Sequence, residues 1–91
     1  MSVTVKIPAQ LRAATGGEGE LEVEGATVGE ALTALVAAYP DLGPRLLDDQ
    51  GGINRFVNVF VNETDVRHLQ ELATPLQSTD TVLLLPAMAG G

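Results

Sequence analysis

The residues of this chain whose types could do chemistry are few, and they form no catalytic set. The 91 residues contain no cysteine, which excludes disulfides, thiolate nucleophiles and thiolate metal ligands together. His68 is the only histidine, without a nucleophile motif or a second metal ligand near it, and we interpret it as a surface residue. Asp48 and Asp49 are neighbours in a loop, so their carboxylates do not converge on one substrate. The sequence therefore predicts no catalytic residue, no metal site, no cofactor bound by this chain and no enzyme activity of its own.

The chemical group that remains is the carboxylate at the C-terminal end. The last five residues are Ala87, Met88, Ala89, Gly90 and Gly91. They are small, uncharged and without a partner element, so we expect them to extend as a flexible tail that enters the active site of a partner. The four residues from Met88 would reach about 13 Å at about 3.3 Å per residue. Paired glycines carry no side chain that would block a narrow channel, although a Gly-Gly end by itself is also common at frayed termini.

Net charge and hydropathy exclude several classes of partner. Twelve acidic residues against five basic ones give a net charge of -7, which opposes binding to nucleic acid because phosphate backbones require clustered Lys and Arg. An acidic protein is attracted to basic protein surfaces, although solubility alone also explains the charge. The sequence has no apolar run long enough to span a bilayer and no signal peptide, so we expect a cytoplasmic protein with no membrane interaction.

The elements that would position the tail begin with a predicted β-hairpin. Val3, Val5 and Ile7 alternate with polar residues, which is the period of a strand with one buried face. Residues 15–19 contain three glycines and predict a flexible turn. Residues 20–24 alternate again, with three glutamates on one face, and this charge places the second strand at an edge of the sheet.

A single long helix follows the hairpin. Thr27 and Glu30 have the spacing of a capping box, in which each side chain satisfies a backbone N–H of the first turn. One apolar stripe at helical spacing consists of Val28, Ala31, Leu32, Leu35, Val36 and Tyr39. Pro40 disfavours helical geometry at the preceding residue and ends the helix.

The second half of the chain predicts mostly strands. Residues 56–61 are an almost continuous β-branched and aromatic run, which indicates a central strand. The other predicted elements are an ordered loop over 40–52, a turn over 62–65, a very short strand from Val66, a helical turn over 72–76, and a last strand over 82–85 that Pro86 ends.

One helix for a whole sheet covers only one sheet face, and this order of elements predicts an α+β fold of the β-grasp (ubiquitin-like) type. We expect a mixed sheet of four to five strands with the main helix on one face, a domain over residues 1–86 and the tail over 87–91. A ferredoxin-like fold would need a second amphipathic helix in the final third of the chain, and Pro75 argues against one.

The face of the sheet that the helix does not cover is a candidate contact surface. The alternation that buries Val57, Val59 and Val61 turns a second set outward. This set comprises Phe56, Asn58, Phe60, Leu83 and Leu85. Exposed apolar patches of this kind mark partner-binding surfaces, unless the loop over 40–52 folds over the patch. Arg55 and Arg67 are candidates to hold acidic groups of a partner.

Over its whole length the chain resembles the ubiquitin-like sulfur carrier proteins of the MoaD/ThiS type. The match is carried by residues 55–62, Arg55-Phe56-Val57-Asn58-Val59-Phe60-Val61-Asn62, by Asp80-x-Val82, and by residues 86–91, Pro86-Ala87-Met88-Ala89-Gly90-Gly91. Within this family the chain looks most like the carriers for cysteine biosynthesis, on Ile7-Pro8, Leu11-Arg12, Thr15-Gly16-Gly17 and the segment from Arg55 to Arg67.

The resemblance implies a protein cosubstrate rather than an enzyme. An E1-like activating enzyme would use ATP to adenylate Gly91, and a sulfur donor would displace AMP and leave a thiocarboxylate. In the cysteine branch this sulfur would attack an aminoacrylate held by a pyridoxal phosphate-dependent cysteine synthase, and a metalloprotease would release the cysteine. ATP and pyridoxal phosphate would belong to the partners. The alternatives are the small subunit of molybdopterin synthase, a shared carrier for another sulfur-containing metabolite, and a ubiquitin-like protein modifier.

Overall fold

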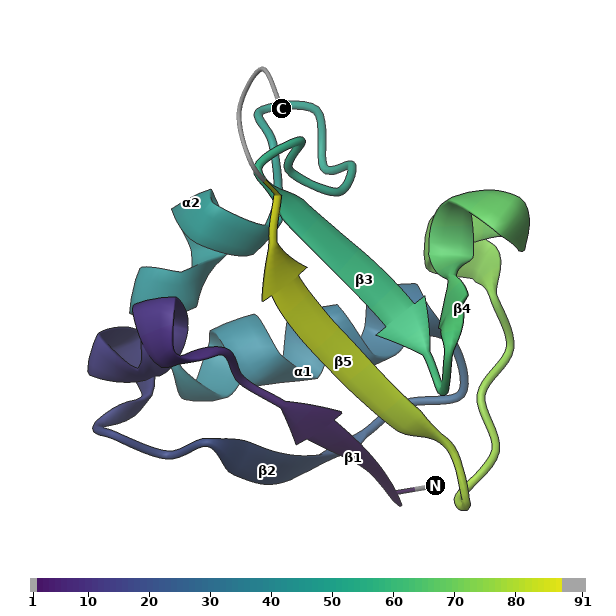
Figure 1. Cartoon of the computed structure of the whole chain (residues 1–91), viewed down its shortest axis with the longest axis horizontal. Helices are drawn as coiled ribbons and strands as arrows, with labels where there is room; N and C mark the ends of the chain where they lie inside the picture. Colours follow the sequence, from purple (N-terminus) through teal and green to yellow (C-terminus); the bar gives the residue numbers. More distant parts are fainter. Residues whose placement is uncertain (1, 88–91) are drawn as a thin grey trace.

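The computed structural model describes residues 2–87, and its centre is one mixed sheet with the strand order β2-β1-β5-β3-β4 (Figure 1). The strands are β1 (Ser2–Lys6), β2 (Glu20–Glu24), β3 (Val57–Val61), β4 (Thr64–Asp65) and β5 (Thr81–Pro86). The pair β1–β5 is parallel and the other three pairs are antiparallel. This arrangement confirms the predicted mixed sheet of the β-grasp type.

The N-terminal hairpin is confirmed, and β2 lies at the edge of the sheet. The predicted turn is present at Gly16 and Gly17, with φ +68° and +93°, and residues Ala9–Thr15 before it form a 3-10 helix, η1, that was not predicted. The hydroxyl of Thr15 donates to the backbone oxygens of Arg12 at 3.1 Å and Glu18 at 2.8 Å, which orders the end of the connection. The prediction missed η1 because only Leu11 and Thr15 of its residues are buried, too few for a helical stripe.

Helix α1 (Val28–Ala38) begins at the predicted cap. The Thr27 hydroxyl accepts the N–H of Glu30 at 3.2 Å, and the Glu30 carboxylate accepts the N–H of Ala26 at 2.9 Å. The second bond reaches one residue further back than in a standard capping box. The helix buries four residues of the predicted stripe, namely Val28, Ala31, Leu32 and Leu35. These side chains pack against one face of the sheet, as the spacing predicts.

The segment after α1 is more regular than the predicted loop. It forms a 3-10 turn, η2 (Pro40–Leu42), and a short helix, α2 (Gly43–Leu46). Each buries one leucine fully, Leu42 and Leu46, in the same core that α1 covers. Leu47 then forms a bridge with Ile53. The segment therefore packs on the helix side of the molecule.

The prediction of an interior strand over residues 56–61 is confirmed by β3, which pairs with β5 on one side and β4 on the other, although the middle strand of the five is β5. One prediction for the second half needs correction. The short strand is Thr64–Asp65 and not a strand from Val66, which is buried and begins a 3-10 helix, η3 (Val66–His68). Asn62 adopts φ 58°, so the turn closes over residues 62–63 and the strand returns two residues earlier than expected. A further 3-10 turn, η4 (Glu71–Ala73), lies close to the helical turn predicted over 72–76.

The core lies between α1 and one sheet face, and no helix of residues 2–87 covers the other face (Figure 1). Val59, Val82 and Leu84 point into this core and are at most 1% exposed. Among residues 2–87, no helix combines the length and the apolar character that a bilayer crossing requires.

Candidate functional site

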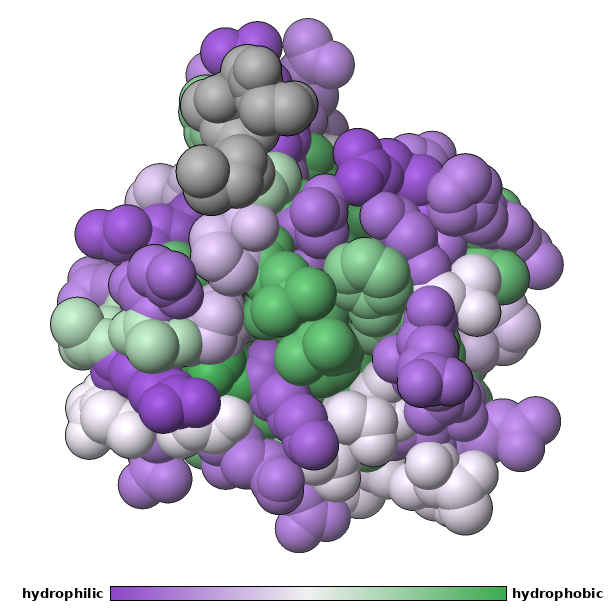
Figure 2. Space-filling model, viewed as in Figure 1, coloured by the Kyte–Doolittle hydropathy of each residue, from purple (hydrophilic) through white to green (hydrophobic). Residues whose placement is uncertain are grey.

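The uncovered sheet face brings together the residues that alternation predicts to point outward. Across β3 and β5, Asn58 lies opposite Leu85 and Phe60 lies opposite Leu83. The intervening pair, Val59 and Leu84, is buried, so these four side chains lie on the other face. We call this surface the outer face, and Figure 2 shows an apolar patch at its centre. Asn58, Phe60 and Leu83 are half-buried, whereas Leu85 is 38% exposed.

The alternative that residues 40–52 fold over this patch is wrong. Leu42 and Leu46, which would provide the apolar cover, are fully buried in the core on the α1 side. The patch at the centre of the outer face is open in the space-filling view (Figure 2). The face is therefore an accessible apolar surface on a small protein, the kind that marks a contact site.

Phe56 lies at the end of the outer face from which the last residues of the chain depart. It precedes β3 rather than belonging to it. Phe56 is 50% exposed and is the most exposed large apolar residue among residues 2–87. Its carbonyl accepts the N–H of Ala87 at 2.9 Å. The Arg55 guanidinium lies 5.0 Å from the centre of the Phe56 ring, a cation–π distance.

The predicted tail falls largely outside the described residues. Ala87, its first residue, is half-buried and held to Phe56 by that backbone hydrogen bond. The predictions for Met88, Ala89, Gly90 and Gly91 lie outside the part of the chain that the structure describes. The chain thus leads into these four residues at the Phe56 end of the outer face.

A polar network borders the apolar patch on the β4 side. Arg67 donates from Nη2 to Asn58 Oδ1 at 2.6 Å and to Asp65 Oδ2 at 3.0 Å, and from Nε to Asp65 Oδ1 at 3.3 Å. The hydrogen bond from the Arg67 side chain holds the pKa of Asp65 below its usual value. The Arg67 side chain is 61% exposed, so this ion pair contributes little stability. Its structural effect is to orient the guanidinium beside the outer face.

Sequence reasoning missed two features of this face. It treated Asp65 as a turn residue, whereas Asp65 pairs with Phe60 in the sheet and its carboxylate accepts hydrogen bonds from Arg67. It also left the face of the β2 glutamates open, although Leu21 and Val23 contact the core and therefore turn Glu20, Glu22 and Glu24 to the outer face. The alternation in β2 contained that signal.

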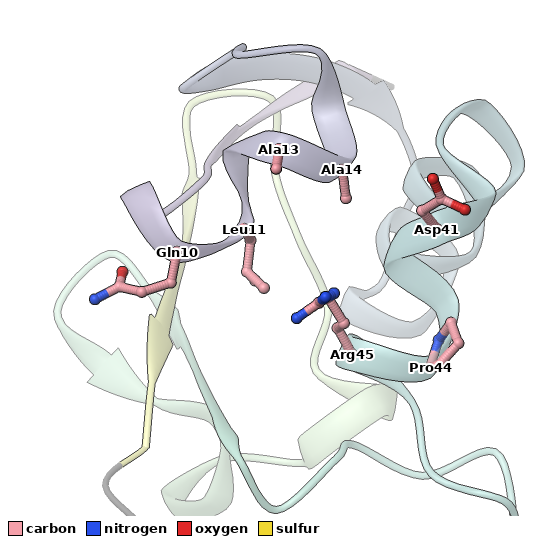
Figure 3. Close-up of a pocket in the computed structure, with 7 residues that line it drawn as sticks. All are labelled: Gln10, Leu11, Ala13, Ala14, Asp41, Pro44 and Arg45. Atoms are coloured by element: carbon pink, nitrogen blue, oxygen red, sulfur yellow. The ribbon is translucent and has the colours of Figure 1, made fainter.

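A pocket of about 430 Å³ lies away from the outer face, between η1 and the segment after α1 (Figure 3). Leu11 and the Arg45 guanidinium point toward one another across it, whereas the Asp41 carboxylate points away. The lining residues are Gln10, Leu11, Ala13, Ala14, Asp41, Pro44 and Arg45. Since one guanidinium without a nucleophile or an acid–base pair does no chemistry by itself, this pocket is not a candidate active site.

The remaining candidates have structural explanations. The Asp48 carboxylate accepts the N–H groups of Gln50 at 2.9 Å and Gly52 at 2.8 Å and so orders its own loop. His68 is exposed in η3, as predicted. No group of three acidic or histidine side chains in residues 2–87 could hold a metal ion.

Comparison with known proteins relates this geometry to a family. The sequence matches the ThiS family over residues 5–91. It is 44% identical over 93 aligned residues to the sulfur carrier protein CysO of Mycobacterium tuberculosis, with all of both chains covered. The crystal structure of the Amycolatopsis orientalis BexX/CysO complex contains a chain that superposes with a TM-score of 0.89 at 42% identity, covering 98% of this chain and 99% of that one. Small archaeal modifier protein 3 of Haloferax volcanii is 44% identical over 66 residues, which cover 72% of this chain and 71% of the relative.

Proposed function

The chain belongs to the ThiS family of ubiquitin-like sulfur carriers, and from this premise we propose that its working group is the carboxylate of Gly91. The observation that supports this most strongly is the full-length match to CysO, in which the aligned region runs to the end of both chains. The described fold adds that β5 leads directly into the last residues beside an open apolar face. The folded part then provides the surface that partners recognise, and the terminal carboxylate is the reactive group.

The chemistry requires activation, because a free carboxylate is a poor electrophile. In the proposed first step a Gly91 carboxylate oxygen attacks the α-phosphate of ATP on an E1-like enzyme, and pyrophosphate leaves. A sulfur donor at the oxidation level of sulfide, such as hydrosulfide, then attacks the acyl carbon, so that a C–S bond forms while the C–O bond to AMP breaks and AMP leaves. Loss of the S–H proton gives a thiocarboxylate, whose anionic sulfur is a nucleophile. The protein is thus a cosubstrate, and ATP and its metal ion belong to the activating enzyme.

The outer face is the surface that we propose for recognition by this enzyme. Burial of Phe56, Phe60, Leu83 and Leu85 would provide a hydrophobic contribution of about 25 cal/mol per Å² of apolar surface removed from water. The last described residue, Ala87, is bound to Phe56 at one end of this face. A partner that covers the face therefore has the start of the tail at its margin.

The same similarity supports a finer proposal for the acceptor. We propose that the sulfur goes to a pyridoxal phosphate-dependent cysteine synthase, that a metalloprotease releases the product, and that the reaction takes place in the cytoplasm. The support is the 44% identity to a protein named as CysO over the full length of both chains. Transfer to purified synthase, followed as loss of the thiocarboxylate and formation of cysteine, tests this step.

Intact mass measurement after incubation with the activating enzyme, MgATP and a sulfur donor tests the main proposal. We expect a mass gain equal to the exchange of one oxygen for one sulfur at the terminus. A variant that lacks Gly91 is the matched control, and it should remain folded but gain no sulfur. The proposal would be contradicted if no activating enzyme of this type adenylates the wild-type protein and the protein gains no sulfur.

A second candidate function is covalent modification of other proteins. It is favoured by the match to small archaeal modifier protein 3 at 44% identity over 72% of this chain. The same adenylate would then react with a lysine amine instead of a sulfur nucleophile and form an isopeptide bond. Mass spectrometry of tagged protein from cells distinguishes the two functions, because only a modifier yields lysine adducts of Gly91.

A further inference from the structure

The outer face has a row of glutamates along one edge, and along the other edge it has Arg67, which is paired with Asp65. The strand order β2-β1-β5-β3-β4 puts the glutamates of β2 on one side of the apolar strip and Arg67 on the opposite side. Phe60, Leu83 and Leu85 lie on β3 and β5 between them. Neighbouring strands are about 4.8 Å apart, so each charged edge lies within about one Debye length of the apolar strip.

The acidic edge is fixed by the register of the N-terminal hairpin. Glu20, Glu22 and Glu24 lie opposite Lys6, Thr4 and Ser2 on β1, and all three are exposed. Glu22 accepts a hydrogen bond from the Ser2 hydroxyl at 3.3 Å. β1 places Lys6 beside this row, and the exposed Glu20 and Glu22 give the edge its negative charge.

The basic edge is oriented by neighbouring side chains. Asp65 and Asn58 hold the Arg67 guanidinium at the distances given above, so the cation has lost part of its conformational freedom before any partner binds. Arg55 is held over the ring of Phe56 at the end where the chain leaves the sheet. Five Lys and Arg residues are present in the chain, and Lys6, Arg55 and Arg67 lie on or beside this face.

We propose that this charge asymmetry fixes the orientation in which the activating enzyme binds the outer face. The inference rests on the proposed function. The complementary enzyme surface has an apolar centre, basic side chains where β2 docks, and a carboxylate where Arg67 docks. Apolar contact alone is not directional, so it also permits a complex rotated by half a turn about the normal to the sheet. In that complex the glutamates face the enzyme carboxylate, and the Ala87 end of β5 points away from the adenylation site.

The experiment compares two double variants with the same change in net charge. Glu20→Lys/Glu22→Lys reverses the acidic edge, and Asp41→Lys/Glu63→Lys reverses two exposed acids in η2 and in the turn after β3, outside the outer face. The readout is kcat/KM for pyrophosphate release by the activating enzyme with MgATP, at low and high salt, after circular dichroism shows each variant folded. We expect a loss of about tenfold or more for the first variant, within the range of electrostatic steering, and about twofold or less for the second. High salt should narrow the difference because it screens exposed charges.

The basic edge has its own matched pair. Arg67→Gln removes the cation but keeps side-chain hydrogen bonds, whereas Asp65→Asn keeps the cation and removes its ion pair. We expect a clear, salt-sensitive increase in KM for the first and a smaller increase for the second, because its cation remains but is less well oriented, with little change in kcat for either. Glu20→Gln/Glu22→Gln replaces the lysine variant if charge reversal disturbs the hairpin.

The outcomes separate the proposal from the function on which it rests. Equal losses in the two double variants would mean that only net charge matters, and would overturn the proposed orientation while sulfur transfer stands. Unchanged kinetics for the Glu20/Glu22 and Arg67 variants would overturn it in the same way. A wild-type protein that gains no sulfur by intact mass would instead refute the proposed function, and with it the named partner.

Discussion

Leu84 and Leu85 are consecutive residues of β5 whose side chains lie on opposite faces of the sheet. Replacement of Leu84 by alanine should lower stability, whereas replacement of Leu85 should lower affinity for the activating enzyme. Leu84 is 0% exposed in the core, whereas Leu85 is 38% exposed on the outer face. Truncation of a buried leucine costs about 3 kcal/mol, because transfer free energy is lost and a cavity remains. A domain of this size has a free energy of unfolding of about 5–14 kcal/mol, so Leu84→Ala removes a large share of it.

The exposed fraction of Leu85 sets the expected effect on binding. Full burial of a leucine side chain is worth about 1.5–3 kcal/mol, and the exposed 38% is what remains for a partner to cover. This gives about 0.6–1.1 kcal/mol, or a threefold to sixfold increase in Kd for the activating enzyme, at about 1.4 kcal/mol per factor of ten. The free energy of unfolding should fall by less than about 1 kcal/mol for Leu85→Ala.

Thermal unfolding and a binding titration on both variants test the assignment of faces. At about 4–8 °C per kcal/mol for a domain of this size, Tm should fall by roughly 12 to 24 °C for Leu84→Ala and by only a few degrees for Leu85→Ala. The titration is done below the Tm of both variants, where Leu84→Ala should bind with nearly wild-type affinity. The reasoning is refuted if Leu85→Ala lowers Tm as much as Leu84→Ala, or if the folded Leu84→Ala variant is the one that loses affinity.

Three further changes test the fold around this face. Thr27→Ala removes the hydroxyl that caps α1 and should lower the free energy of unfolding by about 1 kcal/mol in urea denaturation, with Thr27→Ser restoring most of it. Gly25→Ala should cost about 1–3 kcal/mol, because its new Cβ would lie 2.6 Å from a backbone nitrogen of α1; Gly19→Ala, whose Cβ meets only a movable arginine side chain, should cost much less in the same assay. Since Asp65 has a lowered pKa in the folded protein, its pairing with Arg67 stabilises above the unfolded value of 3.8 and is lost as pH falls through the folded value. Urea unfolding from pH 7 to pH 2 should therefore show a small additional loss of stability at the acid end for wild type relative to Asp65→Asn, small because the pair is exposed, and a larger acid loss for Asp65→Asn would contradict the pairing.

Periodicity in the sequence was sufficient for the elements whose residues alternate between water and core. Single-face burial predicts the hairpin, the stripe of α1 and the outward residues of β3 and β5. It places Leu83 and Leu85 on the outer face, where the structure has them. Sequence comparison confirms the fold and the family, whereas the roles of Gly91 and of the outer face remain predictions.

Strand order and side-chain networks could not be predicted from periodicity, because they depend on contacts between distant residues. Residues 82–85 are all apolar and residues 57–61 are apolar except for Asn58. Nothing local shows that β5 pairs with two long strands whereas β3 lies beside the two-residue β4. The contact of Arg67 with Asn58 joins residues nine positions apart across a turn whose closing residue, Asn62, has a positive φ. The turn had to be placed correctly before that network could be foreseen.

The parallel pairing of β5 with β1 has a consequence for how the protein is made. β5 lies between β1 and β3, so the fifth strand in chain order of residues 2–87 is the one that joins the two hairpins into a single sheet. Until residues 81–86 emerge, β1–β2 and β3–β4 are separate units with unpaired edges. A nascent chain that stops before this point lacks both the complete sheet surface and the residues that follow β5. An enzyme that recognises the complete surface would therefore activate only chains in which β5 has paired.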